Sequence, residues 1–250
     1  MPARKMPLAL IVLAACLASS ASKALVGASE EGGPMAPHAV MVLANHGSSG
    51  GGFCTGVVIA PTVVLTAAHC VSAPQSTRIY FKSGEAPVFM EIAAIAIHPQ
   101  FKAQAPRTRE RSIDLALIRT RAALPSAFKP VTLDERMPRV GDAYGLSGYG
   151  LTREGRGETG GVLRWGKVSA RAPLSNILLW AHDPAGRGFG ACEGDSGGPI
   201  FALDTGALVA ITSWSEGEGK SHCGKLTQAA LIAPQRAWMD GALKGWGVSR

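Results

Sequence analysis

GDSGGP, at residues 194–199, sets a serine among glycines in a chain of 250 residues. Two other informative strings precede it, TAAHC at 66–70 and DLALIR at 114–119. A serine hydroxyl is a weak nucleophile unless an imidazole accepts its proton and a buried carboxylate holds that imidazole in the correct tautomer. The candidates for nucleophile, base and orienting acid are Ser196, His69 and Asp114.

Each string alone has an ordinary structural interpretation. Glycine beside serine is common turn chemistry, and a lone histidine or aspartate is usually a packing or capping residue. The three groups occur in the order His, Asp, Ser, separated by 45 and 82 residues. This combination favours a catalytic interpretation over a structural one.

Five further strings occur in the order of one known family: FCTGVVIAP at 53–61, HPQF at 98–101, SGYG at 147–150, SWSEG at 213–217 and AWMD at 237–240. From about Leu25 to Gly241 the chain resembles the chymotrypsin/trypsin family of serine endopeptidases. The resemblance implies an all-β fold of two packed six-stranded antiparallel barrels with a C-terminal helix. His69 and Asp114 would come from the first barrel and Ser196 from the second, with the site in the cleft between them.

The coarse pattern agrees with a β architecture. Short apolar or alternating runs are separated by Gly, Pro, Ser or charged turns; they lie at 57–59, 63–65, 79–81, 88–97, 115–118, 163–168 and 208–211. Only the tail at 234–243 has helical composition, and 102–111 and 153–161 are expected to be exposed loops. The expected organisation is a protease domain at 25–250, with barrel one at about 37–130, barrel two at about 137–233 and a helix at about 234–245.

Composition sets limits on partners. The net charge is +7, three units of which come from Arg4, Lys5 and Lys23, so the chain from Leu25 onward carries about +4. No cluster of Lys and Arg is interleaved with aromatics, which disfavours nucleic-acid binding. A protein or peptide substrate, a monomeric state and no cofactor or metal are expected, because the cysteines and histidines show no metal-ligand spacing.

The first 24 residues have the pattern of a signal peptide: two basic residues, an apolar run over 8–18 and then small residues. Ser22-Lys23-Ala24 fits the small-x-small pattern before a signal-peptidase cut, which would expose Leu25. A secreted or periplasmic location follows. The alternative is lipid anchoring, since Leu13-Ala14-Ala15-Cys16 also fits a bacterial lipoprotein signal, and membrane attachment is expected only if Cys16 is lipidated.

The start of the mature chain has a chemical role in the resembling family. Leu25 would supply an ammonium group that pairs with Asp195, the residue before the nucleophile, and this buried pair would order the oxyanion hole. Signal peptidase alone would then produce the active form. A cut after Ser22 would leave two residues still to be trimmed.

The resemblance also assigns the four remaining cysteines. Cys54–Cys70 would anchor the histidine loop, and Cys192–Cys223 would join the nucleophile loop to the segment after Trp214. An exported location permits both disulfides.

The family pattern extends to the substrate-binding residues. The backbone N–H groups of Gly194 and Ser196 would form the oxyanion hole, and glycine suits a backbone that approaches the substrate closely. Ser213 would hydrogen-bond the triad carboxylate, while Trp214 and Ser215 would offer backbone pairing to an extended peptide.

The primary pocket is expected at Gly190 and Ala191, with Glu193 also among the substrate-binding positions. Since neither pocket residue is acidic, cleavage after Arg or Lys is disfavoured, and small or medium apolar residues are expected. The opposite wall, between Gly224 and Ala230, does not align with the family. The alternative is a preference for an acidic residue, which His222 or Lys225 would favour.

Two other function classes compete with the protease. Residues 194–198 also satisfy GxSxG, the nucleophile turn of α/β-hydrolases, but that fold needs a strand–turn–helix context and an acid followed by a histidine after the serine. Only His222 follows Ser196, and no βαβ pattern is present. A non-catalytic binding protein on a protease fold is the second alternative, although none of the three catalytic residue types is missing.

Overall fold

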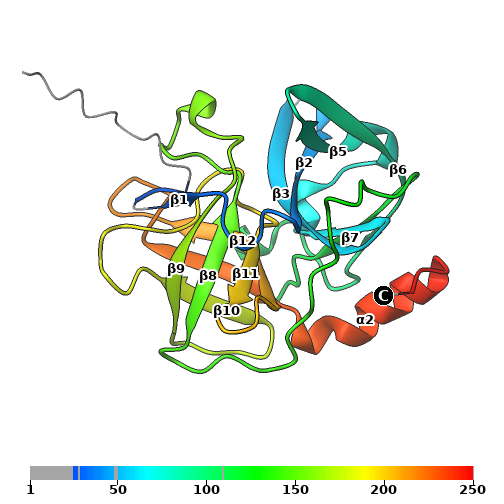
Figure 1. Ribbon diagram of the computed structural model, residues 1–250. Helices are drawn as coiled ribbons and strands as arrows, with labels where there is room; N and C mark the ends of the chain where they lie inside the picture. Colours follow the sequence, from blue (N-terminus) through cyan, green and yellow to red (C-terminus); the bar gives the residue numbers. More distant parts are fainter. Residues whose placement is uncertain (1–24, 28, 48–49, 109, 250) are drawn as a thin grey trace, which may run out of the picture.

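The computed structural model describes residues 25–27, 29–47, 50–108 and 110–249 as two β-barrels followed by a helix (Figure 1). The strands are β1 (Glu30–Glu31), β2 (Ala39–Asn45), β3 (Gly51–Ala60), β4 (Val63–Thr66), β5 (Thr77–Ser83), β6 (Ala86–Ile97), β7 (Ala116–Thr120), β8 (Ala143–Gly148), β9 (Arg164–Arg171), β10 (Leu178–His182), β11 (Pro199–Ala202), β12 (Leu208–Glu216) and β13 (Leu226–Leu231). The helices are α1 (Ala105–Thr108) and α2 (Arg236–Gly245).

Both barrels are closed and antiparallel. Barrel one has the order β2-β3-β4-β7-β6-β5. Barrel two has the order β9-β10-β13-β12-β11-β8, it closes through the pairing of β8 with β9, and β1 adds to the outside of β9. The predicted all-β class of two six-stranded barrels is therefore confirmed.

The apolar hairpin of β3 and β4 packs on both of its faces. Val58 and Val64 point into the core of barrel one, whereas Val57, Ile59 and Leu65 belong to a second core that lies between the barrels. A strand with two buried faces has a continuous apolar sequence rather than an alternating one. This explains the run VVIA followed by VVL, and it places the end of β4 at the junction of the two barrels.

The core between the barrels is continuous with the linker and the C-terminal helix. Leu117 of barrel one, Leu133 of the linker, Ile211 of barrel two and Met239 of α2 are all buried in this one cluster. Because a single apolar core joins these parts, we expect the two barrels to keep a fixed orientation relative to each other.

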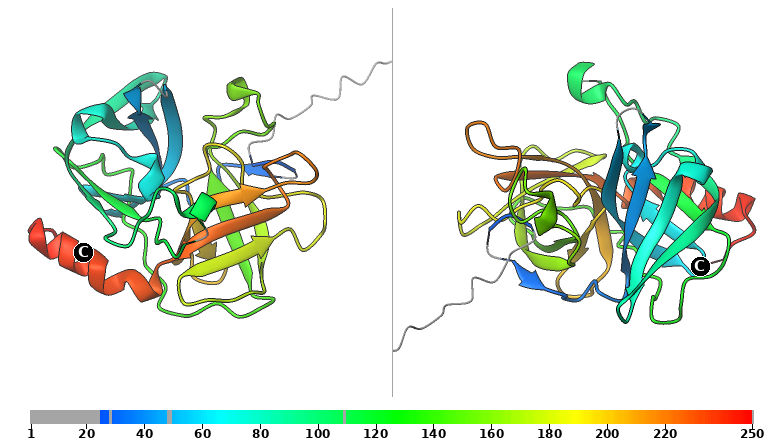
Figure 2. Two further views of the ribbon diagram at one scale, coloured as in Figure 1. Left: turned by 180° about the vertical axis from the view of Figure 1, so that it is seen from behind. Right: turned by 90° about the horizontal axis from the view of Figure 1, so that it is seen from above.

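Helix α2 follows barrel two and packs beside barrel one (Figure 2). Met239 and Leu243, four residues apart, form its buried face. The His98 ring of barrel one lies edge-on to the Trp238 ring, with centroids 4.7 Å apart. The predicted tail helix is thus found, although a short 3₁₀ turn over Ala233–Gln235 replaces its first residues.

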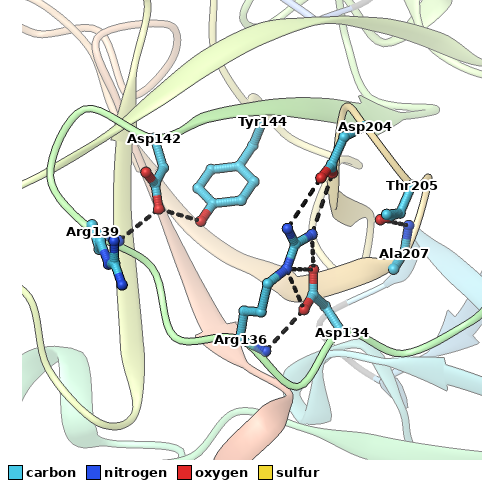
Figure 3. Close-up of polar contacts among 8 residues, drawn as sticks. All are labelled: Asp134, Arg136, Arg139, Asp142, Tyr144, Asp204, Thr205 and Ala207. Atoms are coloured by element: carbon cyan, nitrogen blue, oxygen red, sulfur yellow. Dashed lines mark hydrogen bonds and ion pairs between the residues drawn. The ribbon is translucent and has the colours of Figure 1, made fainter.

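The linker between the barrels is held to barrel two by an arginine (Figure 3). The Arg136 guanidinium donates to both carboxylate oxygens of Asp134 and to both oxygens of Asp204. Leu133 also forms a parallel bridge with Leu208 at the start of β12. These contacts fix the path of the chain from one barrel to the other.

Three further expectations concern the helical segments and the first 24 residues. The loop expected at 102–111 contains the single turn α1, a difference from the prediction that only the tail is helical. No helix in the described part of the chain is long and apolar enough to cross a bilayer. The signal peptide and the Cys16 alternative lie outside the described residues.

Candidate active site

The pairing of β4 with β7 brings His69 and Asp114 together. Thr66 at the end of β4 pairs with Ala116 at the start of β7, so the segments just beyond these two ends meet. His69 lies in a short 3₁₀ turn after β4. Its Nδ1 is 2.6 Å from Asp114 Oδ2, and its backbone N–H donates to Asp114 Oδ1 over 3.0 Å.

Asp114 accepts a third hydrogen bond, from the Ser213 hydroxyl of β12 over 2.5 Å. Its side chain is only 14% exposed. Burial alone would raise the pKa of Asp114, but the hydrogen bonds and charge of His69, with the Ser213 bond, outweigh burial and lower it. The carboxylate therefore stays ionised, and Ser213 ties it to barrel two.

The pKa of His69 is shifted in the opposite direction, upward. Burial would lower the pKa of its imidazole, but the hydrogen bond and negative charge of Asp114 outweigh burial and raise it above the ordinary value of 6.5. The side chain is 40% exposed. With Nδ1 bonded to the carboxylate, Nε2 is the nitrogen left to exchange protons.

The nucleophile loop packs directly against the segment that leads to His69. A Cβ added to Gly197 would lie 2.1 Å from Thr66 Oγ1 and 3.2 Å from the Ala67 nitrogen. The Gly197 N–H donates to the Thr212 carbonyl over 2.7 Å. Ser196 therefore lies between the segment after β4 and β12, the two segments that carry His69 and Ser213.

The expected hydrogen bond from Ser196 to His69 is not formed. Among the contacts of the described residues, the Ser196 hydroxyl has no hydrogen bond, and His69 Nε2 lies 3.7 Å from Cys70 Sγ. Hydrogen bonds of this kind are often long without substrate and shorten in the reacting complex. The structure thus joins His69, Asp114 and Ser213 directly and brings Ser196 beside them without this bond.

Gly194 presents a free backbone donor. Its φ is +91°, in the region that favours glycine, and the Phe53 ring lies where a Cβ would point, 2.3 Å from the added atom. Among the described residues, the N–H groups of Gly194 and Ser196 have no hydrogen-bond acceptor. Two such donors two residues apart can bind a developing negative oxygen.

Asp195 is completely buried beside this turn. Its carboxylate accepts the Gly150 N–H over 2.8 Å and the Cys192 N–H over 2.9 Å. Burial raises the pKa of Asp195 to about 7, and the two backbone hydrogen bonds only partly oppose this. No cation contacts it among the described residues.

Leu25 lies in the same region, although here its nitrogen is part of a peptide bond. Its side chain is buried in a cluster with Phe189 and Ala191, and Val26 forms an antiparallel bridge with Gly190. Leu25 thus reaches the segment before the nucleophile, while the structure describes no ion pair between it and Asp195.

The expected pocket residues lie on neighbouring segments. Gly190 packs on Gly224 so closely that an added Cβ would be 2.9 Å from the Gly224 carbonyl oxygen. The Ala191 N–H donates to Thr227 Oγ1 over 3.1 Å. Thr227 stands opposite Ser215 in the register of β12 and β13. The wall that could not be aligned from sequence therefore contains Thr227, a residue that the sequence did not single out.

Glu154 is a second residue that the sequence did not single out. Its carboxylate accepts the Ser221 hydroxyl over 2.6 Å and the His222 N–H over 2.9 Å. The Ser215 hydroxyl in turn donates to the His222 carbonyl. The exposed loop at 153–161 therefore fixes the segment beside Ser215. In the sequence, Glu154 is one acidic residue in an expected loop, and nothing local indicates that it contacts Ser221 and His222.

Trp214 is 42% exposed on β12, next to Ser213. Its strand pairs with β13 on one edge. Glu193 is exposed at the start of the nucleophile loop. Both residues are thus accessible from solvent near the candidate nucleophile.

Two disulfides surround the site, Cys54–Cys70 and Cys192–Cys223, the same two pairs that the resemblance implies. The sulfurs of Cys54 and Cys70 and the His69 ring come within 4.8 Å of one another, a spacing that would suit a metal ion. Because these sulfurs are bonded to each other, neither can act as a thiolate ligand.

Comparisons with known proteins agree with this geometry. The chain matches the family model described as Trypsin over residues 26–238. It is 27% identical to trypsin delta of Drosophila erecta over 208 residues, which cover 76% of this chain and 79% of that protein. It is 30% identical to kallikrein-8 of Mus musculus over 184 residues, which cover 69% of this chain and 68% of that protein.

A solved structure is also similar. Neuropsin, described as a serine protease expressed in the limbic system of mouse brain, superimposes with a TM-score of 0.68 at 25% sequence identity, covering 86% of this chain and 98% of that one. The family match spans well over half of the chain. This chain belongs to the trypsin family of serine endopeptidases.

Proposed function

We propose that this protein is exported and hydrolyses peptide bonds through Ser196, His69 and Asp114 by way of an acyl-enzyme. The observation that carries the proposal is the linked set of contacts in which Asp114 binds both His69 and Ser213. An ionised, buried carboxylate on Nδ1 is what an imidazole needs to act as a base through Nε2.

In this mechanism, His69 Nε2 takes the proton of Ser196 as the hydroxyl oxygen attacks the substrate carbonyl carbon. The carbonyl oxygen becomes an oxyanion, which the free N–H groups of Gly194 and Ser196 stabilise. His69 then gives the proton to the leaving amine, and an acyl-enzyme remains on Ser196. Water, deprotonated by His69, attacks the ester carbon, and the proton returns to Ser196 as the acid product leaves.

Covalent labelling tests the proposal. We expect a fluorophosphonate to label the chain that begins at Leu25, with the adduct on Ser196 in the peptide mass spectrum. A correctly processed, folded chain that stays unlabelled and cleaves no peptide library would support the non-catalytic alternative instead. An esterase would hydrolyse simple esters while leaving peptide bonds intact.

Export is supported by the two disulfides, because such bonds persist in oxidising compartments. The mature chain is proposed to be a monomer that acts on protein or peptide substrates. We keep 25–250 as the proposed protease domain, with the change from barrel one to barrel two in the linker at 130–140.

Activation is proposed to follow release of the Leu25 ammonium group. A cation beside Asp195 would lower the pKa that burial now raises to about 7. The bridge between Val26 and Gly190 already holds the segment near the nucleophile loop.

The start residue should accordingly change activity. We expect Leu25–Arg250 to have a kcat/KM at least about tenfold above that of Lys23–Arg250 at neutral pH, because only the shorter form has an ammonium group that can pair with Asp195 and order the oxyanion hole, and loss of one such donor costs about 100-fold or more. The raised pKa means that the longer form binds a proton more tightly when folded. It should therefore lose stability as pH rises from about 4 through about 7, and the Leu25 form should lose less.

Asp195→Asn provides the matched control for this prediction. It removes the charge but keeps the size of the side chain. The Leu25–Arg250 and Lys23–Arg250 forms should then have equal activity and an equal pH dependence of the melting temperature. A difference that persists when both forms carry Asp195→Asn would show that the start residue acts through something other than this carboxylate. Amino-terminal sequencing of exported protein checks which start occurs.

For substrate preference, we propose cleavage after small or medium apolar residues. No side chain fits at Gly190, so the pocket base carries no charge to balance an arginine or lysine. Thr227 narrows the base of the pocket, because the hydrogen bond from the Ala191 N–H holds its side chain beside Ala191. The alternative, cleavage after Asp or Glu, is disfavoured because the Glu154 carboxylate places negative charge beside His222.

A peptide library tests this preference. Cleavage after Ala or Val should exceed cleavage after Arg or Lys by at least about 100-fold, because an unpaired buried charge costs several kcal/mol. Thr227→Ala should raise the rate after Leu or Phe, relative to Ala, by about tenfold. Thr120→Ala, another buried threonine, should leave the profile unchanged. Dominant cleavage after basic residues, or after Asp or Glu, would overturn the assignment.

A further inference from the structure

Thr55 is a completely buried polar residue in β3, beside the disulfide at Cys54. Its backbone N–H donates to the Ser196 carbonyl over 2.8 Å. Its hydroxyl donates to the Gly194 carbonyl over 2.9 Å and accepts the Tyr149 N–H over 3.0 Å. One residue of barrel one thus binds two segments of barrel two, including the nucleophile loop.

The direction of the hydroxyl proton follows from these partners. A threonine hydroxyl has one proton and two lone pairs. The Tyr149 N–H can only donate, so its hydrogen bond uses a lone pair of the Thr55 hydroxyl oxygen. The Gly194 carbonyl can only accept, so the Thr55 hydroxyl proton must point to it. Each partner therefore fixes the role of the other, and the hydroxyl is held in a single orientation.

Gly194 needs such an external support. Its positive φ is one that glycine adopts freely, and glycine has more backbone freedom than any other residue. The peptide plane before it is held by the Glu193 carbonyl, which accepts the Leu151 N–H over 2.8 Å. The peptide plane after it is held by Thr55. Between these two anchors the Gly194 N–H has one direction.

We propose that Thr55 is a positioning residue for the oxyanion hole: its hydroxyl, by holding the Gly194 carbonyl, aims the Gly194 N–H at the substrate oxygen. This inference rests on the proposed function, since it assigns Gly194 as a donor in catalysis. Thr55 does not touch the substrate itself. It acts through Gly194, and through Ser196 by the backbone bond.

The hydroxyl can be isolated by comparing Thr55→Ser with Thr55→Ala, two chains that differ only in that group. We expect Thr55→Ala to lower kcat by about tenfold to 100-fold, because small misplacements of catalytic groups have effects of that size. KM should change by less than about threefold, and Thr55→Ser should restore kcat to within about threefold of wild type. Affinity for a peptide boronic acid, which forms a tetrahedral adduct on the serine, should fall with kcat.

Thr120 offers a matched control. It is buried in β7, and its hydroxyl donates to the Ala122 carbonyl over 2.6 Å. Thr120→Ala should reduce thermal stability about as much as Thr55→Ala while leaving kcat unchanged. A structural role for Thr55 predicts the same for both variants, so equal kcat in the serine and alanine variants at position 55 would overturn the proposal.

Two other outcomes are distinguishable. If Thr55→Ala does not fold, Thr55→Cys keeps a similar size with a weaker donor and should give an intermediate loss of kcat; unchanged kcat there would count against the proposal. If the wild-type chain is neither labelled by a fluorophosphonate nor bound by the boronic acid, the proposed function fails first, and the role of Thr55 fails with it.

Discussion

Ser196→Ala is expected to lower kcat on a peptide substrate by on the order of 10⁶-fold and to abolish fluorophosphonate labelling. The reason is that the acyl-enzyme needs an oxygen at this position, beside the N–H groups of Gly194 and Ser196, which have no acceptor among the described residues. Residual catalysis by the donors and by substrate binding should remain above the rate in water. Single-turnover kinetics with a peptide amide measures the loss.

The folded state should be little affected by this change. Ser196 is half-buried, and its hydroxyl makes no hydrogen bond among the described residues, so thermal melting should shift only slightly. Ser175→Ala is a matched control: it removes a hydroxyl that bonds within a turn at Leu178, and it should leave activity unchanged. A Ser196→Ala chain that keeps a kcat near that of the wild type, or that is still labelled by the fluorophosphonate, would place the nucleophile elsewhere.

The catalytic strings could be predicted because their chemistry is local. A glycine-rich turn around serine, a histidine after a buried strand and an aspartate before another strand each carry their signal within five or six residues. The β4–β7 register that joins His69 to Asp114 is a pairing of distant strands, which the apolar runs on either side do not fix by themselves. Long-range order had to be inferred from the resemblance alone.

Strands with little pattern were not predicted. β8 is AYGLSG and β11 is PIFA, both short and largely buried on both faces, so neither shows the alternation that marks a half-exposed strand. The sequence of β13, LTQAAL, fits a helical segment equally well. These three strands and β10, which was not predicted either, complete barrel two, and only pairing with their neighbours defines them.

The supporting polar residues were missed for a related reason. Thr55 stands in an apolar run, and its partners Tyr149 and Gly194 are 94 and 139 residues away. Likewise, Thr227 meets Ala191 across 36 residues. Buried hydroxyls need partners, but a sequence does not say which ones. Their roles depend on tertiary contacts that no local pattern records.

Asp114→Asn is expected to lower kcat/KM by about 10⁴-fold at the plateau of the pH profile. The Asp114 carboxylate accepts from His69 Nδ1, from the His69 backbone and from Ser213. An asparagine that keeps its oxygen on the His69 backbone N–H places its NH₂ at the Oδ2 position, where it faces His69 Nδ1 and the Ser213 hydroxyl, and the imidazole proton then moves to Nε2. That tautomer cannot accept the proton of Ser196, so the general base is lost while the geometry remains.

The same variant should move the acid limb of the profile in a definite direction. In the wild type, Asp114 raises the pKa of His69 above 6.5, so activity is lost as pH falls through that raised value and His69 becomes charged. Without the carboxylate, burial dominates and the pKa of His69 falls. The residual activity should then persist to lower pH than in the wild type.

Asp134→Asn tests whether this response is specific. Asp134 is also buried, and the hydrogen bond from Arg136 lowers the pKa of its carboxyl, but it lies in the linker (Figure 3). Its replacement should weaken the linker contact without moving the acid limb or the plateau. An acid limb that stays in place in Asp114→Asn, or moves to higher pH, would mean that His69 is not the group that titrates. The carboxylate on Nδ1 would then not be what sets the protonation of the catalytic base.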